Sequence, residues 1–128
     1  MKRFYVITLL LLVISCISCK KTPFSPVGPT DVRIRNLTGS NLTEVAVKIK
    51  DEEIAFGTID LNIVSEYHRF KTAFPKAYIF ARINLDTIST GPVDFTYMNY
   101  FGQVKMTYDV TVENNRLKIK NVTLDSPL

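Results

Sequence analysis

The segment from Val104 to Glu113 constrains the fold most, because its side chains alternate strictly between apolar and polar. One face carries Val104, Met106, Tyr108, Val110 and Val112, and the other carries Lys105, Thr107, Asp109, Thr111 and Glu113. A period of two residues is typical of a half-buried β-strand and does not fit a helix. The segment therefore predicts an antiparallel strand with one face on the core and one face in water.

The residues that follow predict a hairpin. Asn114-Asn115 suits a two-residue type I′ turn, because Asn tolerates the positive φ that both central positions require. This turn sets Val112 opposite Leu117. Past Ile119 the inward register falls on the polar Asn121, so we predict a β-bulge near Asn121 that turns the later apolar residue inward.

Earlier parts of the chain show shorter strand signals, at about residues 32–35, 45–50, 54–60, 65–71 and 77–83. Residues 77–83 are apolar on both faces, which predicts a central strand covered from both sides. After the N-terminal segment no window shows apolar residues at helical spacing. The expected fold is therefore all-β: a single antiparallel β-sandwich of about seven strands over residues 30–128, of immunoglobulin-like or transthyretin-like kind.

The first residues of the chain are typical of a secretory signal helix. Met1-Lys2-Arg3 is a short positive region, and an apolar run from Phe4 to Ser15 follows. This run has about 12 residues, whereas a membrane-spanning helix needs roughly 20. We therefore predict a signal peptide and not a transmembrane anchor.

The signal ends at the two cysteines of the chain, Cys16 and Cys19. Val13-Ile14-Ser15-Cys16 resembles the lipobox of bacterial lipoproteins, in which aliphatic and small residues precede a cysteine that becomes acylated. Cys16-Ile17-Ser18-Cys19 is a poorer match, because a cysteine replaces the usual aliphatic residue. The resemblance implies lipid attachment at one of the two cysteines, after a signal of residues 1–15 or, alternatively, 1–18. The alternative is an ordinary cleaved signal with incidental thiols.

Residues 16–29 are predicted to tether the domain to the lipid. Three of the six prolines fall within residues 20–29, and this composition continues neither a helix nor a central strand. In a polyproline-like conformation residues 20–29 span roughly 30 Å, at about 3.1 Å per residue. The membrane is therefore an expected partner, through the N-terminal lipid.

The charge distribution argues against a nucleic-acid partner. The chain has a net charge of +4, but four of its 16 cations precede Thr30. The remaining 12 cations balance the 12 acids, all of which lie in the domain. A neutral domain offers no electrostatic footprint for a phosphate backbone. Arg33 and Arg35 alternate along one strand and are expected to lie on a solvated face.

Few residues could carry catalysis or bind a metal. The chain has one histidine, His68, without a nucleophile elbow, and its cysteines lie at the signal. Asp51-Glu52-Glu53 lacks the alternating oxygen ligands of a calcium loop and is expected to form a solvated turn. We therefore predict no catalytic site, no metal site and no cofactor.

The most unusual segment lies between Pro92 and Gly102, where four aromatic residues and a Met occur in an expected connection. In one interpretation Tyr97, Tyr100 and Phe101 form a binding loop, because amphipathic aromatic side chains stack on glycans and peptides. In the other, Phe95, Tyr97 and Phe101 close one end of the sandwich core. A domain without Trp has to fill its interior with Phe and Tyr, which favours the core interpretation.

Several short segments together resemble a group of small lipoproteins of Bacteroidota-type bacteria. They are Cys19-Lys20-Lys21, Val32-Arg33-Ile34-Arg35-Asn36, Phe56-Gly57-Thr58-Ile59, Ser65-Glu66-Tyr67, Phe70-Lys71-Thr72-Ala73, Ala77-Tyr78-Ile79 and Pro92-Val93-Asp94-Phe95. The resemblance implies an outer-membrane lipoprotein of the cell envelope and supplies no reaction. Surface-displayed members tend to carry acidic residues after the acylated cysteine. Lys20-Lys21 departs from that pattern and favours a periplasm-facing domain over surface display.

These observations lead to two functional hypotheses. The first is a non-enzymatic, membrane-anchored module that binds an envelope protein or serves a structural role. The second is a surface module that binds glycans or mediates adhesion, motivated by Tyr97 and Tyr100. The sequence specifies neither the ligand nor the oligomeric state.

Overall fold

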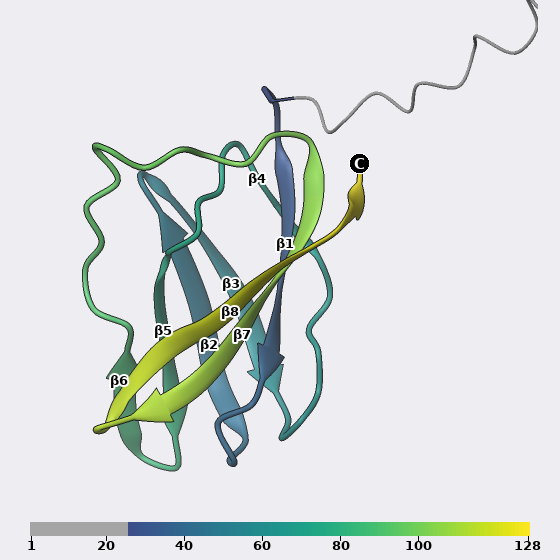
Figure 1. Cartoon of the computed structure of the whole chain (residues 1–128). Coiled ribbons are helices and arrows are strands. Elements are labelled where there is room, and N and C mark those ends of the chain that lie inside the picture. Colours follow the sequence, from purple (N-terminus) through teal and green to yellow (C-terminus); the bar gives the residue numbers. More distant parts are fainter. Residues whose placement is uncertain (1–25) are drawn as a thin grey trace, which may run out of the picture.

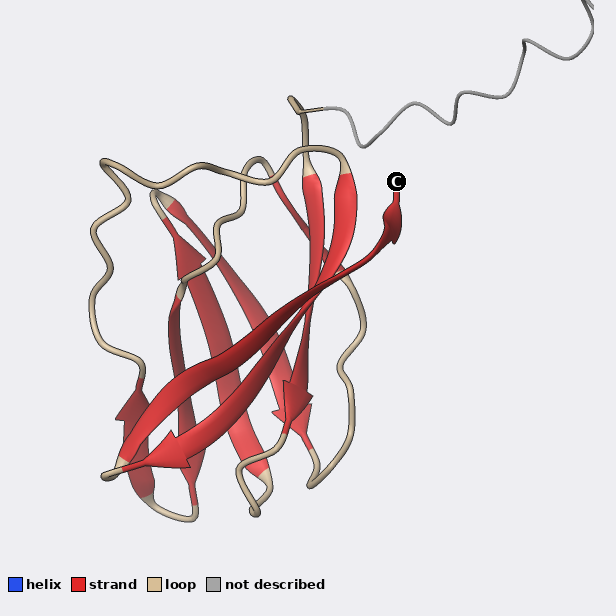
Figure 2. Ribbon diagram, in the orientation of Figure 1, coloured by secondary structure: helices blue, strands red, loops and turns tan. Residues whose placement is uncertain are grey.

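The computed structural model describes residues 26–128, which form eight strands (Figures 1 and 2). The strands are β1 (Thr30–Asn36), β2 (Leu42–Ile49), β3 (Glu52–Ile59), β4 (His68–Phe70), β5 (Tyr78–Ile83), β6 (Asp86–Ser89), β7 (Val104–Glu113) and β8 (Arg116–Pro127). No helix occurs within these described residues, and so none there could span a membrane. The predicted signal helix of residues 1–15 lies outside them.

The strands form two four-stranded sheets that pack face to face, with the orders β4-β1-β7-β8 and β3-β2-β5-β6. The predicted all-β sandwich is confirmed, with eight strands where about seven were expected. The core between the sheets is aliphatic and aromatic. Its largest fully buried side chains are Tyr108, Phe70, Phe74, Ile34, Leu42, Ile49, Ile59, Ile79 and Met106.

One strand pairing departs from the antiparallel expectation. β1 lies parallel to β7, in a register that runs from Asp31 opposite Lys105 to Asn36 opposite Val110. All the other pairings between strands are antiparallel. β1 therefore pairs with β4 and β7, which come much later in the sequence, and not with the next strand, β2.

The β7–β8 hairpin forms as predicted. Asn114 and Asn115 both have positive φ, at 51° and 59°, and Val112 pairs with Leu117. The ladder register shifts between Ile119 and Asn121, which is the position of the expected bulge. Beyond the bulge Val122 packs against the core, whereas Asn121 is exposed.

The coverage of two strands differs from the prediction. β5 lies inside its sheet, between β2 and β6, but Tyr78 and Phe80 on its outer face are only half-buried. The prediction of a strand covered from both sides is therefore wrong for β5. The strand with that property is β7, where Thr107 and Asp109 on the supposedly solvated face are buried. Side chains of the neighbouring strands cover this face, as described below.

The expected strand at residues 65–71 is reduced to β4, three residues long. The segment before β4 instead crosses the end of β1, where the amide of Ser65 donates to the carbonyl of Ile34 at 2.8 Å. The Ser65 hydroxyl accepts from the amide of Ile34 at 2.9 Å. A side chain thus supplies one of the pairings that a longer strand would have made.

Candidate binding site

The connection between β6 and β7, residues 90–103, is the longest loop of the domain. Figure 2 shows it running up one side of the sandwich from β6 and then across one end to β7. The described chain begins at this same end, which we call the tether end (Figure 1). The side-chain amide of Gln103 donates to the carbonyl of Val27 at 3.2 Å, so the loop contacts the entering chain directly.

The inner side of the loop is part of the core. The Phe95 ring packs against the Phe74 ring with their centroids 4.8 Å apart. The amide of Phe101 donates to the carbonyl of Ala73 at 2.8 Å, and the Phe101 side chain packs on the core. The buried hydroxyl of Tyr108 in turn donates to the carbonyl of Phe74. Residues 73 and 74 therefore fix the loop to the centre of the sandwich.

The outer side of the loop exposes two tyrosines. Tyr97 is 97% exposed and Tyr100 is 45% exposed. The Asp94 carboxylate accepts from both the amide and the hydroxyl of Thr96, which closes a tight turn just before Tyr97. These two hydrogen bonds hold the pKa of Asp94 below its ordinary value. The loop thus presents Tyr97 to the solvent from a fixed turn.

The structure divides the aromatic segment between the two interpretations. Phe101, a candidate binding residue, packs on the core together with Phe95. Tyr97, expected in the core under the favoured interpretation, lies almost fully in solvent, and Tyr100 is also exposed. Among the aromatic residues of this segment, Tyr97 and Tyr100 are therefore the two that a ligand can reach.

A groove of about 490 Å³ lies between this loop and β8. Its lining includes the buried side chains of Ala77 and Leu117 as well as Met98 from the loop. Lys76 and Lys118 bring positive charge to the same groove. A volume of this size is within the range of about 300–1,000 Å³ that ligand sites occupy.

One wall of the groove belongs to a sheet edge. β8 is the last strand of its sheet, so the backbone groups on its outer edge have no strand partner among the described residues. Leu117, Lys118 and Ile119, which line the groove, all lie on this strand. The Lys118 ammonium contacts Glu113 at 2.7 Å across the hairpin, and both side chains are more than half exposed. A free strand edge beside an apolar hollow is a geometry that accepts an extended peptide.

A polar network on the outer face of sheet β4-β1-β7-β8 was not foreseen from the sequence. The carboxylate of Asp125 accepts from the hydroxyls of Tyr67 at 2.8 Å and Thr107 at 2.6 Å. The Thr107 hydroxyl accepts from Nε of Arg33 at 2.9 Å, and the Arg33 guanidinium lies 4.6 Å from the centre of the Tyr67 ring. The network joins β1, β7, β8 and the segment before β4.

The network changes the ionisation of Tyr67. Burial raises the pKa of its phenol above the ordinary value of 10.0, and the hydrogen bond to Asp125 and the charge of Asp125 raise it further. Arg33 and Thr107 act in the opposite direction. The phenol therefore loses its proton, and with it the hydrogen bond that it donates to Asp125, at a higher pH than an ordinary tyrosine does.

Two ion pairs extend this polar face. Arg35 lies 3.4 Å from Asp109, and Arg69 contacts Asp31 at 2.7 Å. The hydrogen bonds that the Arg69 guanidinium donates to Asp31 raise the pKa of Arg69. Arg33 and Arg35 thus do not form the simple solvated face that was expected, because they cover Thr107 and Asp109.

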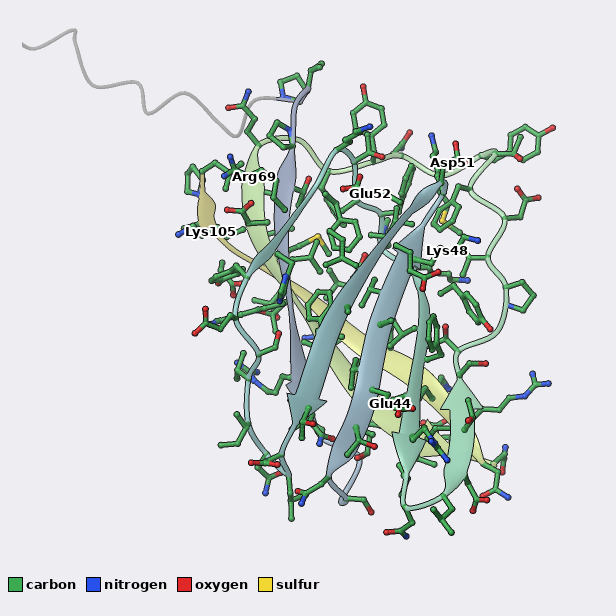
Figure 3. All side chains as sticks on the ribbon, turned by 180° about the vertical axis from the view of Figure 1, so that it is seen from behind. Glu44, Lys48, Asp51, Glu52, Arg69 and Lys105 are labelled. Atoms are coloured by element: carbon green, nitrogen blue, oxygen red, sulfur yellow. The ribbon has the colours of Figure 1, made fainter. Side chains whose placement is uncertain are left out.

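Figure 3 contrasts the positions of the charged side chains. Arg69 and Lys105 lie on the side where the chain enters, whereas Glu44 lies on the other sheet. Glu44 has one charged contact, at 3.3 Å from Arg82, and both side chains are more than one third exposed. The outer face of that sheet therefore has no counterpart to the network.

The residues considered for catalysis or metal binding lie apart from the groove. His68 begins β4, and its ring lies 4.3 Å from the ring of Phe56. The solvated turn expected at Asp51-Glu52-Glu53 is wrong for two of its residues, because Glu52 and Glu53 begin β3 and only Asp51 lies in a turn. A carboxylate oxygen of Glu52 accepts from the amide of Lys71 at 3.0 Å, which joins the start of β3 to the residue after β4. Within residues 26–128 no group of three His, Cys, Asp or Glu side chains has the arrangement of a metal site.

The sequence foresaw the aromatic loop but missed the groove. The groove forms where Ala77, Met98 and Leu117, which are far apart in the chain, come together in one lining. No local pattern encodes this meeting, because it depends on how the two sheets stack. Cys16 and Cys19, the candidate lipidation sites, lie outside the described residues, as do Lys20-Lys21.

Comparisons with known proteins place the chain in no family. Neither a protein-family profile nor a curated protein sequence matches it. Its structure is similar to the NMR structure of a protein from Eubacterium rectale, with a TM-score of 0.45 and 12% sequence identity. The similarity covers 82% of this chain and 96% of the other.

Proposed function

We propose that this protein is a non-enzymatic lipoprotein of the cell envelope whose β-sandwich binds a protein partner. The observation that carries this proposal is the groove of about 490 Å³ beside the free edge of β8. An extended segment of a partner could add to this edge as a further strand and place an apolar side chain over Leu117 and Ala77. The charged side chains of the groove include both signs, Lys76 and Lys118 with Asp94, so the partner segment needs no particular net charge.

A binding role also fits the arrangement of the polar side chains. The ring of His68 packs against that of Phe56, and His68 shares no hydrogen bond with a hydroxyl or thiol among the described residues. A nucleophilic mechanism needs such a partner within reach. The polar side chains around Asp125 are bonded to one another and hold strands together.

The proposed attachment to the membrane rests on the sequence at Cys16 and Cys19. Its direct test is labelling of growing cells with a palmitate analogue, followed by detection of label on the purified protein. We expect Cys16→Ala to abolish labelling and Cys19→Ala to preserve it. The reverse result would move the acylated residue to Cys19, and full labelling of the double variant would contradict lipid attachment at this motif.

Photo-crosslinking in living cells tests the proposed partner site. A photoreactive phenylalanine derivative is placed at Lys118 in the groove or, as the control, at Glu44 on the outer face of the other sheet. Their side chains are 58% and 68% exposed, so both positions are accessible. We expect an adduct of defined mass from position 118 and none from position 44. Equal adducts from both positions, or none from position 118, would contradict the groove as a partner site.

We propose that the domain faces the periplasm, in keeping with Lys20-Lys21 after the cysteines. Protease added to intact cells should leave the domain uncut, and permeabilisation of the outer membrane should expose it. Digestion in intact cells would instead place the domain on the cell surface.

A surface glycan-binding or adhesive module is the second candidate. The observation that favours it is the 97% exposure of Tyr97, because an exposed aromatic ring is a stacking platform for a sugar. This candidate predicts that the lipid-free protein is retained on immobilised polysaccharide, and that Tyr97→Ala with Tyr100→Ala abolishes retention. Unchanged retention of the double variant would exclude these two residues.

A further inference from the structure

We infer that the tether end of the sandwich is a membrane-contacting surface, on which Tyr97 and Tyr100 enter the interfacial region of the bilayer that holds the lipid anchor. This inference rests on the proposed lipid attachment. It goes beyond attachment because it assigns lipid, and not the protein partner, as the ligand of the exposed tyrosines.

The first step of the argument is the place where the chain enters the domain. Val27 lies at the tether end, held to Gln103 by a hydrogen bond of 3.2 Å (Figure 1). Between an acylated Cys19 and Val27 the chain reaches at most about 30 Å, and from Cys16 about 40 Å, at the extended limit of about 3.6 Å per residue. The lipid anchor therefore keeps the tether end close to the bilayer, so that the effective concentration of lipid at this end is high.

The second step is that both tyrosines belong to this end. The ring of Tyr100 lies 6.3 Å from that of Phe74, and the ammonium of Lys50, from the turn between β2 and β3, lies 5.1 Å from the same ring. The neighbouring Phe101 bonds to Ala73, and the hydroxyl of Thr30 donates to the carbonyl of Gly102 at 2.8 Å. The loop that exposes Tyr97 therefore caps the end at which β1 begins.

The third step is the chemistry of the exposed groups. Tyr is enriched at the membrane–water interface, because its ring is apolar and its hydroxyl stays hydrated. Val27 adds an aliphatic side chain that is 64% exposed at the same end. The turn closed by Asp94 and Thr96 fixes the loop beside Tyr97, so little ordering is needed on contact.

Charge does not oppose this contact and does not drive it. Lys50 and Lys71 lie beside Asp51 and Glu52, and Lys76 shares the groove with Asp94. These cations and acids balance, so the contact is expected to form on zwitterionic as well as anionic lipid.

The absence of Trp from the chain provides a clean test. Tyr97→Trp introduces a single indole at a position 97% exposed, and Leu85→Trp introduces one at a control position 84% exposed. Leu85 lies in the turn between β5 and β6, at the opposite end of the sandwich (Figure 1). Each full-length variant is purified from cells with its lipid and reconstituted in phosphatidylcholine vesicles with or without brominated acyl chains.

We expect the indole at position 97 to shift its emission to shorter wavelength and to lose about half its intensity in brominated vesicles, as expected for a side chain at the interface. The indole at position 85 should keep the emission of a residue in water, and 0.5 M salt should change neither result. Equal quenching at the two positions, or none at position 97, would overturn the inference.

Flotation of the same vesicles separates this inference from the anchor. If the protein floats with the vesicles but the indole at position 97 stays unquenched, the lipid anchor is supported and the membrane contact of Tyr97 is overturned. The glycan hypothesis would then be the remaining proposal for Tyr97. If the protein does not float, both the proposed lipid anchor and the membrane contact that rests on it are contradicted.

Discussion

The outer faces of the two sheets are held together in different ways. On sheet β4-β1-β7-β8, Asp125 joins Tyr67, Thr107 and Arg33 into one network that covers β7. On sheet β3-β2-β5-β6, charged side chains form one exposed pair between Arg82 and Glu44. The first face is therefore stabilised by groups that depend on one another, whereas substitutions on the second should act singly. Four predictions test this difference.

The largest effect is expected from Asp125→Ala. Removal of this acceptor leaves the hydroxyls of Tyr67 and Thr107 and the guanidinium of Arg33 without their shared partner. We expect the free energy of unfolding to fall by about 2 kcal/mol, as is usual when a bonded polar group that is partly buried loses its partner. Urea denaturation measures this loss. Glu44→Ala on the other sheet is the matched control, and an equal loss there would contradict the contrast between the two faces.

Thr107→Val should cost about 1 kcal/mol, because its hydroxyl both donates to Asp125 and accepts from Arg33 in a fully buried position. The double variant with Asp125→Ala should lose less free energy of unfolding than the sum of the two single losses, since each substitution breaks the same network. Urea denaturation of the wild type, the two single variants and the double variant provides the comparison. Strict additivity would show that Thr107 and Asp125 act independently.

Tyr67 is expected to make the stability depend on alkaline pH. Its pKa is raised on folding, so its contribution is complete below pH 10.0 and is lost as the pH rises through the higher folded value. Tyr67→Phe should therefore lose less stability than the wild type above pH 10. The ultraviolet titration of the folded variant should also lack one phenol with a midpoint above 10. A missing component at or below 10 would contradict the proposed bond to Asp125.

The smallest effect is expected for the pair on the other sheet. A double-mutant cycle of Arg82→Ala and Glu44→Ala should give a coupling energy below about 0.5 kcal/mol, because both side chains are exposed and screened. Thermal unfolding at low and at high salt provides the measurement. A coupling above 1 kcal/mol would make the two faces alike.

The elements predicted correctly from the sequence are those whose conformation is determined by residues close to one another in the chain. Asn114-Asn115 specifies a turn by its own backbone preference, and the turn then sets Val112 opposite Leu117. The bulge near Asn121 followed from the same register. Such features depend on neighbours within a few residues, so a single sequence contains what is needed.

The elements predicted incorrectly depend on distant partners. Residues 77–83 looked like a strand covered on both sides, yet Tyr78 and Phe80 are only half-buried, and their ring centroids lie 5.7 Å apart. Conversely, Thr107 looked solvated, but the parallel register places Arg33 beside it. The apolar or polar pattern of a strand does not show whether its outer face is buried, because long charged side chains of adjacent strands can also cover that face and exclude water.

The candidate site was predictable only in part, for the same reason. Four aromatic residues between Pro92 and Gly102 marked the loop, but which of them point outward is set by Phe74 and Ala73, which hold Phe95 and Phe101. The groove depends on contact between loop and hairpin and has no signature of its own.

The parallel pairing of β1 with β7 has a mechanical consequence. If the N-terminus is held at the membrane and a partner is held on β8, a pulling force enters at Thr30 and leaves through the β7–β8 hairpin. Because β1 and β7 run in the same direction over six residue pairs, this force acts along the strands and strains their hydrogen bonds together. The pairing resists such shear more strongly than a hairpin opened from its end, where the bonds break one at a time. An anchored domain with this topology can transmit tension between the membrane and a partner without unfolding at its first strand.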